Sequence, residues 1–167
     1  MSHFASITHI TRKARRMAFT LLECVAVITV LAFAVPATLS WVDDSASNRA
    51  DAINAARATM LGTAVMEHVL GDVASTTSGQ GATALASSST YLDTATTGLV
   101  ARMSAVSSYY ATLGITYTVT IGSLTEFDGV SRGGAGDVFR LVTVTVSFPS
   151  ARGGTLTVPI STRVAAL

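Results

Sequence analysis

An unbroken run of uncharged residues near the N-terminus constrains this chain more than any other feature. From Cys24 to Val42 the sequence reads CVAVITVLAFAVPATLSWV, without Asp, Glu, Lys or Arg. As a helix this run would be about 28 Å long, close to the thickness of a bilayer's hydrocarbon core. Trp41 lies at its far end, where aromatic residues favour the membrane interface, and Asp43 and Asp44 follow. The run therefore predicts one membrane-spanning helix.

The charges around this run predict its orientation. Charged residues make up only 13% of the 167-residue chain, against roughly 25% in a typical soluble protein. Residues 12–16 hold four basic side chains, and residues 1–18 contain no acid. Under the positive-inside rule this flank stays in the cytoplasm and the C-terminal body is exported. The basic cluster is too short for a nucleic-acid-binding arm, so no nucleic-acid partner is expected.

Helical periodicity continues beyond the apolar run. Over residues 43–74 apolar residues recur at steps of three, four and seven, with polar residues mostly between them. This pattern is typical of an amphipathic helix, and the alanine-rich composition favours helix as well. We expect one long helix with a transmembrane half over residues 19–42 and an amphipathic half over residues 43–74. Its predicted buried face consists of Ile53, Met60, Leu61, Ala64, Val65 and Val69.

The segment after this helix predicts a loop and then a short helix. Residues 75–98 are almost all Ser, Thr, Gly and Ala and show no periodicity, which indicates a loop. Apolar residues at helical spacing follow from Leu99 to Leu113, and Gly114 is expected to end that helix.

The last third of the chain predicts antiparallel strands. Apolar and polar residues alternate over residues 115–121, 142–148 and 156–164, which is the period of half-buried strands. Pro159 on the polar side of the last run suggests an edge strand. The expected fold class is therefore α+β, with the long helix packed on a three-stranded antiparallel sheet within residues 99–167.

The stretch from Arg15 to Cys24, RRMAFTLLEC, resembles the cleavage and methylation site of type IV prepilins and type II secretion pseudopilins. In that family a basic leader ends at a small residue, usually Gly, and Phe or Met followed by Thr-Leu-x-Glu opens an apolar helix. The resemblance implies that residues 1–18 are a leader. It also implies that a prepilin peptidase cuts between Ala18 and Phe19, and that the new N-terminus at Phe19 is methylated. Ala18 departs from the usual Gly but is still small.

Glu23 is the residue in this motif with a cost of its own. A carboxylate costs roughly 2.5–3.5 kcal/mol near a bilayer centre and less at the edge, so its position requires a compensating interaction. The resemblance implies one, the amino group of Phe19 on a neighbouring subunit, which would fix the helix register in a fibre. The alternative is that Glu23 extends to the membrane interface.

Pro36 interrupts the predicted membrane helix chemically. It removes the hydrogen bond to the carbonyl group of Ala32 and predicts a kink or local melting. Pilin helices often carry a proline about one turn later, at the position of Ser40, and in family fibres such melting gives extensibility. A proline that the helix merely tolerates is the alternative.

Three acidic residues form a candidate metal site. Glu126, Asp128 and Asp137 fall between two predicted strands, and some of the pseudopilins that this chain resembles bind calcium in such a loop. Their spacing matches no dedicated calcium motif, and a solvated loop is the alternative. No other metal and no cofactor is expected.

The sequence contains no recognisable catalytic motif. His68 is the one histidine outside the leader, and no serine lies in a GxSxG motif. We therefore expect a structural protein rather than an enzyme. It would be a minor pilin or pseudopilin of the bacterial inner membrane, whose partners are other pilin subunits and the prepilin peptidase. The alternative is a signal-anchored or secreted binding domain unrelated to a pilus.

Overall fold

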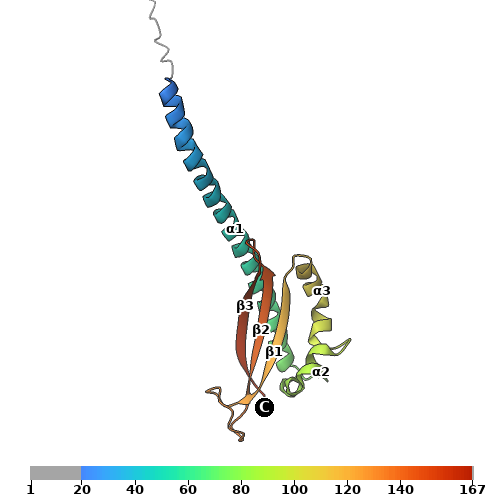
Figure 1. The fold of residues 1–167 in the computed structure, drawn as a ribbon. Helices are drawn as coiled ribbons and strands as arrows, with labels where there is room; N and C mark the ends of the chain where they lie inside the picture. Colours follow the sequence, from blue (N-terminus) through green and yellow to red (C-terminus); the bar gives the residue numbers. More distant parts are fainter. Residues whose placement is uncertain (1–19, 167) are drawn as a thin grey trace, which may run out of the picture. The chain divides into compact units, whose positions relative to one another are not determined.

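The computed structural model describes residues 20–166, and its first element is one long helix (Figure 1). Helix α1 runs from Leu21 to Val73, a length of 53 residues. It is long and apolar enough to cross a membrane. The chain divides into two compact units that meet between Asp43 and Asp44, and each is described by itself.

In the first unit, every side chain of α1 from Leu21 to Asp43 is exposed. Large apolar residues are among the most exposed, including Leu21 at 84% and Phe33 at 78%. Such a surface is unfavourable in water and suits lipid or neighbouring apolar helices. The helix continues through Pro36, so the local melting predicted there is not seen in the described helix. The hydroxyl group of Thr38 donates a 2.9 Å hydrogen bond to the carbonyl of Val35 beside this proline.

The second unit, which we call the body, begins at Asp44. In it α1 buries one face in a core shared with the later helices and the sheet. Leu61, Val65 and Val69 are fully buried, as predicted. The predictions for Met60 and Ile53 are wrong, because these side chains are 65% and 46% exposed. The observed face repeats at steps of three and four, and neither residue belongs to it. It consists of Ala58, Leu61, Gly62, Val65, Met66, Val69 and Asp72.

The sheet has three antiparallel strands in the order β1-β2-β3. Strand β1 spans Thr116–Thr125, β2 spans Phe139–Pro149 and β3 spans Thr155–Ala165. Alternate residues of β2 are buried while the threonines between them are half-buried, so one face of the sheet supplies the core. This is the predicted α+β fold, and its long helix against a three-stranded sheet is a pilin-like architecture.

The segment between α1 and the sheet is more structured than the sequence predicts. It contains the 3-10 helix η1 over Ala82–Ala86 and helix α2 over Ser88–Asp93, followed by helix α3 over Leu99–Ala111. Leu85 and Tyr91 are buried in the core. These two side chains are too few and too widely spaced to produce a periodic signal among Ser, Thr and Gly, which explains why the sequence indicates a loop.

Two features hold the body's part of α1 against the β2–β3 hairpin. Asp51 accepts hydrogen bonds from the hydroxyl of Ser150 at 3.0 Å and the backbone N–H of Ala151 at 2.7 Å. Gly62 lies so close to β3 that an added Cβ atom would be 2.6 Å from the Cδ1 atom of Ile160. Helix and sheet can approach this closely only because position 62 has no side chain.

Candidate functional site

Helix α1 begins with a reciprocal cap that joins Thr20 and Glu23. The backbone N–H of Glu23 donates to the Thr20 hydroxyl at 3.2 Å, and the backbone N–H of Thr20 donates to Oε2 of Glu23 at 3.4 Å. This arrangement is a capping box, in which Thr is the N-cap and Glu is the third helical residue. The Thr-x-x-Glu spacing in the sequence is the signature of this cap.

The cleavage residues predicted next to this cap lie outside the described residues. Ala18 and Phe19 immediately precede Thr20, the first residue that the structure describes. The predicted cut between Ala18 and Phe19 stays a prediction, and in the sequence it precedes both residues of the cap, Thr20 and Glu23. A cut there would leave the helix start intact, since both members of the cap lie after it.

The acidic loop between β1 and β2 is organised by an arginine. Arg132 pairs with Glu126 at 2.5 Å and with Asp128 at 2.7 Å. Asp137 instead accepts hydrogen bonds from the backbone N–H groups of Arg132 and Gly133. The carboxylates that a calcium ion would need are thus paired with a guanidinium group and with backbone N–H donors. Among residues 20–166 there is no group of three or more His, Cys, Asp or Glu side chains that could hold a metal ion.

A partly buried ion pair that the sequence did not predict lies at the C-terminal end of α1. Asp72 accepts two hydrogen bonds from the guanidinium group of Arg102, at 2.6 and 2.5 Å, and one from the Tyr91 hydroxyl at 2.6 Å. These bonds tie α2 and α3 to the end of α1. A signal was available, because Asp72 continues the apolar face three residues after Val69.

The surroundings of this network shift the pKa values of its members. Burial acts to raise the pKa of Asp72, but the hydrogen bonds from Arg102 and Tyr91 outweigh it, so the pKa is lowered. Burial and the hydrogen bond to Asp72 raise the pKa of the Tyr91 hydroxyl. These shifts favour the charged carboxylate and the neutral tyrosine, the states in which the hydrogen bonds of the network form.

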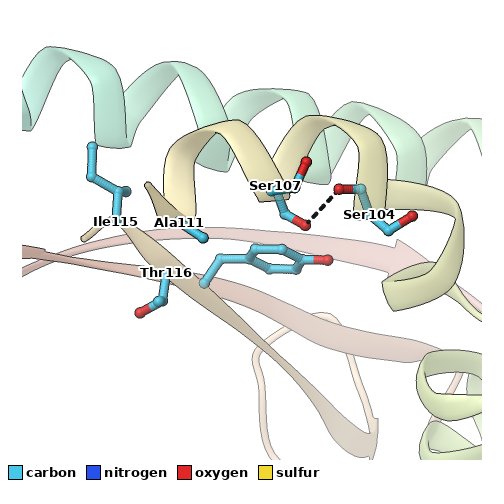
Figure 2. A pocket seen from close by; sticks show the side chains of 7 residues that line it. Ser104, Ser107, Ala111, Ile115 and Thr116 are labelled. Carbon is cyan, nitrogen blue, oxygen red and sulfur yellow. Dashed lines mark hydrogen bonds between the residues drawn. The ribbon is translucent and has the colours of Figure 1, made fainter. Parts of the chain in front are cut away.

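An open cleft lies between α3 and the start of β1. Ser104, Ser107 and Ala111 come from α3, and Ile115 and Thr116 come from the chain entering β1 (Figure 2). The cleft has a volume of about 370 Å³. Its remaining lining residues are Ser108 and Tyr117.

Comparisons with known proteins found no relative of this chain. No protein-family model matches it, and neither curated proteins nor solved structures gave a match. The pilin-like architecture therefore rests on the helix and the sheet themselves.

Proposed function

We propose that this protein is a structural subunit, a minor pilin or pseudopilin, of a type IV pilus or a type II secretion pseudopilus. The observation that carries the proposal is helix α1. Over residues 21–43 it presents apolar side chains to its surroundings on every side, and over residues 58–72 one face forms the core of the body. One helix that serves both as an anchor and as the spine of a small α+β body is what a fibre of packed N-terminal helices requires.

The apolar half of α1 needs cover, and it has two environments available. In the bacterial inner membrane, lipid surrounds it, with the basic leader in the cytoplasm and the body exported. In a fibre, the same half of neighbouring subunits replaces lipid. Transfer between the two exchanges one apolar environment for another, so it demands little desolvation of side chains.

Glu23 supplies specificity to this exchange. Both hydrogen bonds with Thr20 use Oε2, so Oε1 has capacity to accept a hydrogen bond from an amino group. After cleavage the N-terminal amine of Phe19 on a neighbouring subunit is the proposed donor. In a partly desolvated setting such a pair fixes one register between helices.

Processing of variants at the leader junction tests this proposal. Ala18→Leu should leave the precursor uncut and retained in the inner membrane, because the peptidase needs a small residue there. Ala18→Gly is the matched control and should be cut at least as well as the native chain. Intact-mass analysis of the membrane fraction distinguishes the products. The same mature N-terminus in Ala18→Leu and in the native chain would contradict cleavage by a prepilin peptidase at this junction.

A further inference from the structure

Strand β1 has one edge without a strand partner. In the described sheet β1 pairs only with β2, so alternate residues direct backbone N–H and C=O groups to the other side. Within residues 20–166, none of the backbone hydrogen bonds formed outside the helices and the sheet involves residues 116–125. This edge is therefore a ready row of donors and acceptors.

Two helices, α2 and α3, flank this edge and leave a groove beside it. Both α2 and α3 contact β1, and two cavities lie along the contact, of about 370 and 230 Å³. The cavities share Tyr117, which makes them neighbours along the strand. The wall formed by α3 has only small side chains over its last two turns, and it consists of Ser104, Ser107, Ser108 and Ala111.

The groove contains polar groups that await partners. The hydroxyl oxygen of Tyr117 is buried and has no hydrogen-bond partner among the described residues. The Ser107 hydroxyl donates to the backbone carbonyl of Ser104 at 3.4 Å (Figure 2), and the Ser108 hydroxyl donates to the carbonyl of Ala105 at 3.1 Å. Both hydroxyl oxygens can still accept a hydrogen bond. Asp93 is the one charged residue that lines either cavity.

We propose that this groove binds an extended peptide segment of a partner protein, which adds a fourth strand to the sheet beside β1. Strand addition at an exposed edge satisfies backbone groups on both sides and is a recurring mode of peptide recognition. The proposal goes beyond the proposed function, because it holds whether or not the chain enters a fibre.

The lining residues specify the chemistry of this segment. When the segment binds, the Tyr117 side chain turns toward it, so that the hydroxyl donates to one of the segment's carbonyl groups and is no longer without a partner. Its side chains that face α3 are small or β-branched, because the groove is narrow there and lined by serines. A Lys or Arg at the end near Asp93 completes the match, whereas an acidic residue at that end is repelled.

The test uses the full-length protein in detergent micelles and a library of blocked synthetic heptapeptides. Pools with Lys or Arg at one terminal position and β-branched residues at alternate positions should bind. The selected peptide should slow amide hydrogen exchange in β1 over residues 116–119. A library without any binder, or protection that falls on β3 instead, would overturn the proposal.

Variants of the groove separate this site from other surfaces. Ser107→Trp should weaken binding about tenfold or more by filling the groove, and Tyr117→Phe about fivefold by removing one hydrogen bond. Thr157→Trp is the control, since Thr157 is exposed on β3, and it should bind normally. Asp93→Asn should weaken only peptides with a basic end.

Two further outcomes decide against this occupant. The site would be contradicted if Tyr117→Phe bound the peptide as tightly as the native chain does. Ser107→Trp would have to match the native chain in peptide affinity as well, at equal thermal stability. Sedimentation in micelles that shows self-association, abolished by Ser107→Trp, would assign the groove to a second copy of this chain instead of a partner peptide.

Discussion

At the scale of single residues, Glu23 has one observed role and one proposed role. Its carboxylate and the Thr20 hydroxyl close a capping box at the start of α1, and its negative charge is available to a neighbouring subunit. The cap needs an oxygen acceptor at the third helical position, which Gln supplies as well as Glu. Only the proposed pairing needs the charge. Substitutions at this one position can therefore separate helix start from assembly.

Glu23→Gln should keep the cap and lose assembly. We expect this variant to be processed and to remain in the inner membrane, because removal of a carboxylate lowers the cost of insertion. It should be depleted from sheared fibres, since the attraction to the Phe19 amine of a neighbour is lost. Glu23→Asp keeps the charge with a shorter reach and is the control for charge alone. Immunoblots measure the amount of each variant in the sheared fraction. A native amount of Glu23→Gln there would rule out the electrostatic role.

Asp72 is the residue on which stability of the body should depend most sharply. Asp72→Asn leaves the partly buried guanidinium of Arg102 without its counter-ion and should cost about 1–3 kcal/mol of unfolding free energy. Glu67→Gln is the control, because Glu67 is an exposed acid on the same helix. Denaturant titration of the full-length protein in micelles measures both. Equal midpoints for the two variants would contradict the role assigned to this pair.

The same residue predicts a pH dependence. The pKa of Asp72 is lower in the folded protein than its ordinary value of 3.8, so the native state favours the charged carboxylate. Its contribution is complete above the unfolded pKa and is lost as the pH falls through that value toward the folded one. Thermal unfolding from pH 6 down to pH 3 should show a steeper loss for the native chain than for Asp72→Asn.

At the scale of elements, the long helix and the strands could be predicted because their signals are long and regular. The apolar run, the helical spacing around Leu61 and the alternation around Val144 each suffice to predict the element that contains them. What could not be predicted depends on contacts between segments distant in sequence. Tyr91 in α2 is buried, and its hydroxyl donates a hydrogen bond to Asp72, which lies 19 residues earlier in the chain. Met60 is exposed because the opposite side of the helix faces the sheet.

The spacing between α1 and the sheet should depend on Gly62. Gly62→Val places a branched side chain where a Cβ atom already meets Ile160 at 2.6 Å and Val146 at 3.1 Å. We expect a loss of about 1–3 kcal/mol of unfolding free energy from overpacking. Gly71→Val is the matched control on the same helix, because an added Cβ there meets nothing within 4 Å, and its effect should stay within about 0.5 kcal/mol. Equal effects of the two substitutions would show that the close approach is not rigid.

At the scale of the whole molecule, the chain combines a unit that water does not solvate well with a body that has its own core. The core cluster draws its buried residues from the body's part of α1, from α2 and α3, and from the sheet. Among residues 20–43, which are the described part of the other unit, none belongs to that cluster. Membrane anchoring and fibre packing are the roles that we propose for their exposed apolar surface.

The mature N-terminus of the protein in a sheared fibre fraction tests this account most directly. We predict that intact-mass analysis and N-terminal sequencing will find chains that begin at N-methylated Phe19, because leader removal precedes assembly and supplies the amine for Glu23. Chains in that fraction that begin at Met1, or at a residue within the apolar run after Phe19, would contradict the account. The same holds if the protein is absent from the fibres of cells that assemble them normally.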